Sequence, residues 1–139
     1  MYKMMLHGLD GSESSFKALT EAIDLASRTG AELHTISVEE IPRYAGTVGE
    51  VVEEKEAADR RFAEAIAKVR ELGAAKDVKI SSHVVVGHEV KSIVEFVKAN
   101  KFDLLVIGFM GHSAVYERVM GGTCQNLVRL APCSVLVVK

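Results

Sequence analysis

Apolar residues along the chain form short runs that alternate with longer amphipathic stretches. The runs cover residues 4–6, 33–38, 78–86, 104–107 and 135–138, and most of their apolar side chains are aliphatic. Runs of this length, bounded by polar residues, glycine or proline, are typical of β-strands. The pattern therefore predicts five strands.

The stretches between the runs carry apolar residues at spacings of three and four, which is the period of a helix. The first stretch begins after Ser12, a residue type that caps helices, and stops at Gly30. The second has an apolar face that ends at Gly73, where we expect the helix to end, and its charged residues are interpreted as a solvated face. A third helical face spans residues 90–97, and a fourth helix stops before Pro132.

This alternation predicts an α/β protein. The run 104–107 has no polar alternation, as expected for a central strand of a parallel sheet that helices cover on both faces. We expect an open, doubly wound, five-stranded parallel sheet with helices on both faces. The 139 residues contain no repeat or linker, so we expect one domain over residues 1–139. The irregular segment 41–49 is interpreted as a mobile surface loop.

Composition narrows the class of protein. The chain is 48% hydrophobic and 26% charged, and its 17 basic and 19 acidic residues give a net charge of −2, which argues against a general nucleic-acid binder. No apolar run reaches the length of a membrane span and no signal peptide is recognisable, so we expect a cytoplasmic protein. Cys124 and Cys133 form no C-x-x-C motif and are expected to be reduced thiols. His7, His34 and His83 are too widely spaced to indicate a zinc site.

Glycines mark the candidate binding site. In such a sheet, ligands bind beyond the carboxyl ends of the strands, where the strand order reverses. The segment after the fourth strand has glycines at the end of the strand and again at the expected start of a helix, at positions 108, 111, 121 and 122. Backbone N–H groups at such glycines and the helix dipole favour an anion, which indicates a phosphate site; ordinary turn residues are the alternative. Neither a G-x-x-x-x-G-K-[ST] loop nor a G-x-G-x-x-G loop is present, which disfavours a Walker-type NTPase and a Rossmann dehydrogenase.

The spacing of Gly108, Gly111 and Gly121 matches the G-x2-G-x9-G-[ST] signature up to its final position. In this respect the chain resembles ATP-binding members of the universal stress protein family. The likeness spans the whole chain and includes the Asp-Gly-Ser-Glu that begins at Asp10, Gly87 after the third strand, and the closing residues 131–139. The resemblance implies an adenine nucleotide α-hydrolase-like fold with strand order 3-2-1-4-5.

The resemblance also implies an adenine nucleotide, ATP or AMP, with or without magnesium, as the ligand. Asp10, followed by Gly11, would contact the adenosine moiety, and the main chain near Val38 would contact the adenine edge. A carboxylate is acceptor-only and suits ribose hydroxyls; the alternative for Asp10 is an Asx turn or helix cap. The residues expected around the phosphates are Gly108, Gly111, His112, Gly121, Gly122 and Thr123.

Several positions depart from the family pattern. Gly122 replaces the Ser or Thr after the third glycine, Phe109 and Met110 are apolar where many relatives are polar, and His112 stands where a basic residue is common. Neutral histidine binds phosphate more weakly than lysine or arginine. Thr123 either supplies the missing hydroxyl or caps the helix.

Three further side chains have two readings each. His88 either faces the cleft or is a surface residue at a helix start. Arg118 either clamps a phosphate or is solvated, and Cys124 is either activated by the helix dipole or a buried, inert thiol.

The leading hypothesis is a regulatory stress-response protein that binds an adenine nucleotide and acts as a homodimeric switch on an unknown protein partner. Nucleotide would bias the segments 41–50 and 109–120. One alternative is a nucleotide-free dimeric interaction protein of the same fold. A weaker one is an enzyme, either a slow ATPase or a redox protein using Cys124, because no catalytic base is evident beyond Asp10 and His112. The apolar fifth strand is expected to pair with a second copy through Val135, Leu136, Val137 and Val138.

Overall fold

The computed structural model describes residues 1–40, 48–110 and 122–139. Strands and helices alternate along them, in the order that the hydrophobic pattern predicts. The elements are β1 (Met4–Gly8), α1 (Glu13–Thr29), β2 (Glu32–Glu40), α2 (Val48–Ala75), β3 (Ile80–Gly87), α3 (Glu89–Asn100), β4 (Leu104–Gly108), α4 (Gly122–Leu130) and β5 (Ser134–Val138).

The five strands form one parallel sheet with the order β3-β2-β1-β4-β5, which confirms the expected fold. The chain first adds strands on one side of β1 and then returns to add β4 and β5 on the other. The strand order therefore reverses between β1 and β4. In β1, Leu6 lies opposite His34 of β2 and Leu105 of β4.

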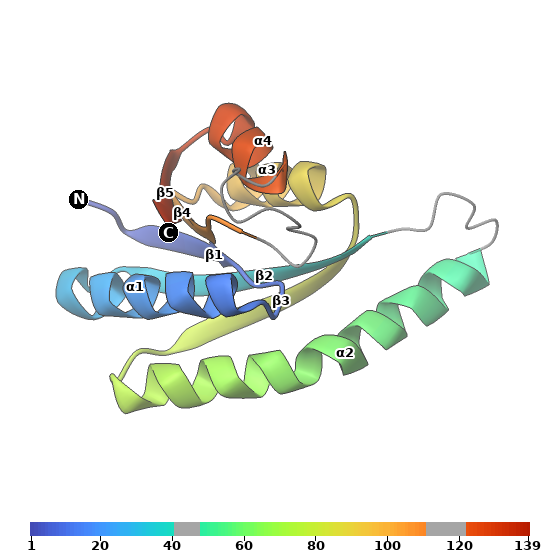
Figure 1. Ribbon diagram of the computed structural model, residues 1–139, viewed down its shortest axis with the longest axis horizontal. Coiled ribbons are helices and arrows are strands. Elements are labelled where there is room, and N and C mark those ends of the chain that lie inside the picture. Colours follow the sequence, from blue (N-terminus) through green and yellow to red (C-terminus); the bar gives the residue numbers. More distant parts are fainter. Residues whose placement is uncertain (41–47, 111–121) are drawn as a thin grey trace.

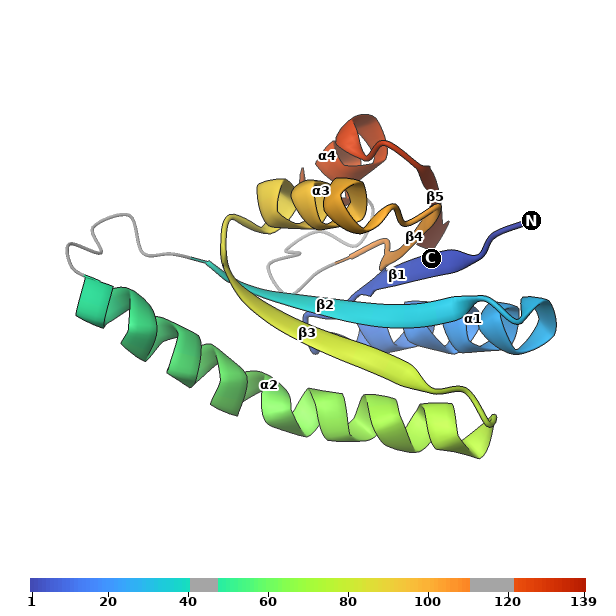
Figure 2. The same cartoon turned by 180° about the vertical axis from the view of Figure 1, so that it is seen from behind.

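Helices cover both faces of the sheet. α1 and α2 lie against one face, and α3 and α4 lie against the other (Figures 1 and 2). Each face has its own buried cluster, with Met5, Leu19 and Val69 on the α1 side and Leu6, Ile93 and Leu127 on the α3 side. β4 is buried from Leu104 to Ile107, as its lack of alternation predicts for a central strand.

The caps of α1 follow the local signals in the sequence. The Ser12 side chain accepts a hydrogen bond from the backbone N–H of Ser15, and Gly30 closes the helix in the left-handed conformation with φ 74°. These two residues satisfy backbone groups that the helix itself leaves unpaired. The start of α1 is thereby fixed directly beyond the end of β1.

The prediction that Gly73 ends α2 is wrong, because α2 continues to Ala75. Gly73 is buried within the helix, and a Cβ atom there would lie 2.6 Å from the carbonyl oxygen of Val78 and 2.8 Å from Cδ1 of Ile80. The chain turns back just after the helix, where the Val78 N–H donates to the Gly73 carbonyl over 2.8 Å. The glycine therefore permits this close approach and does not stop the helix.

The predicted loop at residues 41–49 is partly helical, because α2 begins at Val48. Residues 41–47 lie outside the described part of the chain. The first part of α2 projects past the carboxyl end of the sheet (Figures 1 and 2). Among the described residues, no helix combines the length and the apolar character that crossing a bilayer requires.

Candidate functional site

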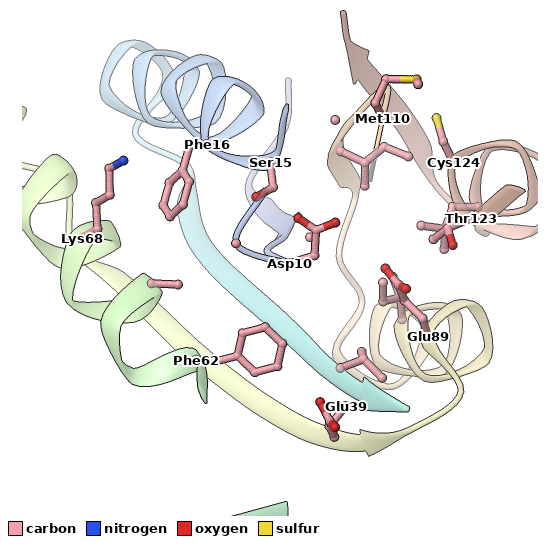
Figure 3. A pocket seen from close by; sticks show the side chains of 18 of the residues that line it. Asp10, Ser15, Phe16, Glu39, Phe62, Lys68, Glu89, Met110, Thr123 and Cys124 are labelled. Atoms are coloured by element: carbon pink, nitrogen blue, oxygen red, sulfur yellow. The ribbon is translucent and has the colours of Figure 1, made fainter. Parts of the chain in front are cut away.

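A cavity of about 1050 Å³ lies at the carboxyl end of the sheet. Its walls come from the ends of β1, β2 and β4 and from all four helices. Figure 3 shows Asp10 near the middle of this cavity, with Phe16 and Lys68 toward one side and Thr123 and Cys124 toward the other. The cavity thus includes the reversal of strand order between β1 and β4, where doubly wound folds bind ligands.

Asp10 is held in place by the turn between β1 and α1. Its Oδ1 accepts a hydrogen bond from the backbone N–H of Ser12 over 2.8 Å, and Gly11 between them has φ 82°. The Asx turn that the sequence offered as the alternative reading is therefore present. It engages one carboxylate oxygen, and both Asp10 and Gly11 line the cavity.

Val38 presents its backbone to the cavity just beyond the end of β1. The Leu9 N–H donates to the Ile36 carbonyl over 2.9 Å, so Ile36 directs its backbone groups toward β1. Backbone groups alternate sides along a strand, so those of Val38, two residues on, point to the same side. β1 has ended there at Gly8, and Val38 lines the cavity. A donor and an acceptor at one place suit the edge of a purine base.

The residues at and just after the end of β4, Gly108, Phe109 and Met110, form what we call the β4 exit. A Cβ atom on Gly108 would lie 2.7 Å from the carbonyl oxygen of Ser14, so only glycine lets the β4 exit pack this closely against α1. The Met110 N–H donates to Ser14 Oγ over 3.2 Å, and the Phe109 N–H donates to the Val138 carbonyl over 2.9 Å. Of these three residues, Gly108 and Met110 line the cavity.

The N-terminus of α4 lines the same cavity as the β4 exit, and Figure 3 shows Thr123 and Cys124 on the same side of Asp10 as Met110. Gly122 and Thr123, in the first turn of α4, both line the cavity. The first N–H groups of a helix lack intrahelical acceptors and attract anions. A Cβ atom on Gly122 would meet no atom within 4 Å, so packing does not require glycine at this position.

Sequence reasoning missed the wall that α2 contributes. Phe62 and Ala65, on the apolar face of α2, line the cavity together with Glu64 and Lys68, which the helical pattern assigned to a solvated face. The Lys68 ammonium lies 4.2 Å from the centre of the Phe16 ring in α1. No local pattern indicates this wall, because it depends on how α2 is placed relative to α1.

The cavity carries mostly acidic groups. The charged side chains among its described lining residues are Asp10, Glu39, Glu64, Lys68, Glu71 and Glu89. Five of these are carboxyls and one is an ammonium group. An anionic ligand here can be neutralised by Lys68, by backbone N–H groups, by a bound cation, or by residues beyond the described ones.

Other candidates from the sequence lie outside the described residues or away from the cavity. Gly111, His112 and Gly121, with Arg118 between them, lie outside the described residues. His88 precedes α3, its side chain is 70% exposed beside Glu40, and it does not line the cavity, which fits the surface reading.

Cys124 is buried in the cavity wall, and burial raises the pKa of its thiol. This favours the buried, inert thiol over activation by the helix dipole, because burial disfavours the thiolate.

The three histidines that the sequence marked as structural also lie away from the cavity lining. His34 Nδ1 and His83 Nε2 form a hydrogen bond of 2.9 Å, and His83 packs against Phe96. The Nε2–H of His7 donates to the Ser15 carbonyl over 2.7 Å. Within the described ranges, no three His, Cys, Asp or Glu side chains are grouped as metal ligands.

Comparisons with known proteins agree with the observed fold and identify relatives of the chain. The family model described as the universal stress protein family matches residues 1–139. Universal stress protein MJ0531 of Methanocaldococcus jannaschii is 31% identical, and the match covers 100% of this chain and 83% of that protein. Among solved structures, a universal stress protein UspA from Lactobacillus plantarum is 25% identical with a TM-score of 0.84, covering 99% of this chain and 98% of that one.

A second solved structure, described as a universal stress protein in complex with cAMP, is 26% identical with a TM-score of 0.77. The match covers 99% of this chain and 97% of that chain. These similarities extend over the whole of the chain. The protein belongs to the universal stress protein family.

Proposed function

We propose that this protein binds an adenine nucleotide in the cavity at the carboxyl end of the sheet and acts as a regulatory protein in a stress response. The observation that carries the proposal is the position of the cavity, which both the β4 exit and the N-terminus of α4 line. The relative solved in complex with cAMP supports an adenine nucleotide as the ligand class.

The described residues fit the adenosine part of such a ligand. Asp10 keeps one carboxylate oxygen beyond its bond to Ser12, and that oxygen can accept a hydrogen bond from a ribose hydroxyl. The N–H and C=O of Val38 face the same side and can pair with the donor and acceptor on the adenine edge. The N-terminus of α4, at Gly122 and Thr123, suits the phosphates.

The acidic lining bears on the choice between ATP and AMP. ATP brings more negative charge than AMP into a cavity whose described lining has five carboxyls and one lysine. We expect a divalent cation such as Mg²⁺ to favour ATP more than AMP, because it offsets this repulsion. A nucleotide-free interaction protein is the competing function, and the same acidic lining favours it.

We further propose a homodimer in which the fifth strands of two copies pair in antiparallel fashion. β5 is an edge strand of the sheet, and Leu136 is 38% exposed on it. An apolar edge strand with unpaired backbone groups is a surface that proteins cover. We propose no catalytic step, and the raised pKa of Cys124 argues against a thiol-dependent redox activity.

Isothermal titration calorimetry of nucleotide-stripped protein tests the proposal with ATP and AMP, each with and without Mg²⁺. We expect saturable binding, with Mg²⁺ raising the affinity for ATP more than for AMP. Asp10→Asn keeps an oxygen for the Ser12 N–H and removes the second carboxylate oxygen, so it should weaken binding roughly tenfold or more.

The matched control is Asp24→Asn, which removes an exposed carboxylate paired with Arg28 on α1 and should leave binding unchanged. Absence of binding of either nucleotide up to millimolar concentration would overturn the proposed function. The search would then turn to protein partners.

A further inference from the structure

Three serines begin α1, and their side chains do different things. Ser12 Oγ accepts from the Ser15 N–H over 3.1 Å, and Ser15 Oγ donates to the Ser12 carbonyl over 2.8 Å. Both bonds stay within the first turn of the helix. Ser14 Oγ instead accepts from the Met110 N–H, 96 residues away in sequence, at the β4 exit.

The β4 exit is tied on two sides. The Phe109 N–H donates to the Val138 carbonyl of β5, and the Met110 N–H donates to Ser14 Oγ of α1. Both N–H groups are therefore engaged by the protein. Phosphate must be bound by other groups, and the two bonds act to hold this wall of the cavity in position.

The β4 exit packs closely against α1 at Gly108. A Cβ atom on Gly108 would lie 2.7 Å from the carbonyl oxygen and 2.8 Å from the carbonyl carbon of Ser14. The backbone of the β4 exit thus lies directly against both the hydroxyl and the backbone carbonyl of Ser14 in α1. The Ser14–Met110 bond adds a directional contact next to this packing.

We propose that Ser14 is a positioning residue that holds the β4 exit and so sets the affinity of the nucleotide site for phosphate. This inference rests on the proposed function. The β4 exit and the N-terminus of α4, at Gly122 and Thr123, are the walls that would flank the phosphates. The distance between the β4 exit and the N-terminus of α4 stays constant only if the β4 exit is held in place. Small displacements of either one weaken a ligand that binds both.

The adenosine part of the ligand should be insensitive to Ser14. Asp10 is oriented through Ser12 and Val38 is positioned by β2, and neither depends on the Ser14 hydroxyl. The role therefore predicts a specific pattern. Loss of the hydroxyl weakens ligands that carry phosphate and leaves adenosine unaffected.

The test compares AMP and adenosine binding to the wild-type chain, Ser14→Ala and Thr20→Ala, by calorimetry. Thr20→Ala is the matched control, because it removes an exposed side-chain hydrogen bond to the Phe16 carbonyl on the same helix. We expect Ser14→Ala to weaken AMP binding roughly three- to tenfold, the effect of one hydrogen bond, and adenosine binding less than twofold. Thr20→Ala should change neither.

Hydrogen exchange at the Met110 amide, followed by NMR, gives a second readout that needs no ligand. Ser14→Ala should speed this exchange, whereas Thr20→Ala should not. Equal weakening of AMP and adenosine, no weakening of AMP, or unchanged exchange at Met110 would each overturn the proposal.

Failure of the proposed function has a different signature. If the wild-type chain binds neither AMP nor adenosine, the nucleotide proposal fails and the phosphate role of Ser14 fails with it. If the wild-type chain binds both, the nucleotide proposal stands, and the AMP and adenosine affinities of Ser14→Ala test the role of Ser14 separately.

Discussion

His7 is fully buried in β1, and burial lowers the pKa of its imidazole from 6.5 to about 4. Its hydrogen bond to the Ser15 carbonyl and the nearby Asp10 carboxylate oppose this shift but do not cancel it. The folded protein therefore holds His7 neutral at pH values where the unfolded chain takes up a proton. This difference in protonation makes the stability of the protein depend on pH.

We expect the neutral His7 to make the protein less stable as the pH falls. Its contribution is fully present above pH 6.5 and is lost as the pH falls toward 4, and the loss is roughly 3 kcal/mol in the free energy of unfolding. Urea unfolding at several pH values should show this loss in the wild-type chain. His7→Gln cannot titrate, so it should lack that part of the slope, and an identical pH dependence in both chains would refute the assignment.

Cys124 lies in the wall of the cavity as a buried thiol with a raised pKa. We expect it to react with iodoacetamide at neutral pH much more slowly in the folded protein than in urea, because the reactive thiolate is disfavoured. Mass spectrometry of the alkylated peptide measures this rate. Rapid alkylation of Cys124 in the folded chain would show that the site does activate the thiol.

At the scale of elements, α2 shows where local sequence patterns are insufficient to predict the end of a helix. Both ends of α1 follow from residues in its own neighbourhood, Ser12 and Gly30, and the structure confirms them. Gly73 carries the same kind of local signal as Gly30, but its role depends on Val78 and Ile80, which pack against it after the chain turns back. The sequence shows that residue 73 is a glycine, but it does not show this tertiary contact.

Gly73→Ala should therefore destabilise the protein, although alanine is the better helix former. The added Cβ would lie 2.6 Å from the Val78 carbonyl oxygen, a backbone atom that cannot move without shifting the turn. We expect a loss of about 1–3 kcal/mol in the free energy of unfolding, typical of overpacking. Chemical denaturation measures it, and a gain in stability would show that the turn has room.

The candidate site, like the helices, could be predicted from the sequence only in part. The segments around Asp10, Val38, Gly108 and Thr123 come together at one end of the sheet because parallel strands all end there. The parallel sheet predicts that these strand ends meet, whereas the resemblance to the family supplied the strand order and singled out Asp10 and Val38. The α2 wall and the Ser14–Met110 contact did not follow, because each depends on how distant elements pack against one another.

At the scale of the whole molecule, the proposed dimer makes a geometric prediction. The Val138 carbonyl faces the β4 side, because it accepts from the Phe109 N–H. By alternation along the strand, the backbone groups of Val137 point away from β4, toward the open edge. Val137→Pro would remove an N–H from that edge and leave the pairing with β4 intact.

Light scattering at micromolar concentration should give the wild-type chain twice its mass of 15.1 kDa. Val137→Pro should give the monomer mass with a circular dichroism spectrum that still shows the folded α/β structure, because the pairing of β5 with β4 is retained. A monomeric wild-type chain, or a dimeric Val137→Pro variant, would show that β5 is not the interface.

We propose that an adenine nucleotide binds at the reversal of strand order between β1 and β4. NMR titration of isotope-labelled protein with AMP locates the ligand directly, through the backbone amides whose shifts change. We expect saturable changes concentrated at Gly8 to Gly11, Val38, Gly108, Gly122 and Thr123. Absence of change at millimolar AMP, or changes confined to the opposite end of the sheet around Tyr2, Asp103 and Ser134, would contradict it.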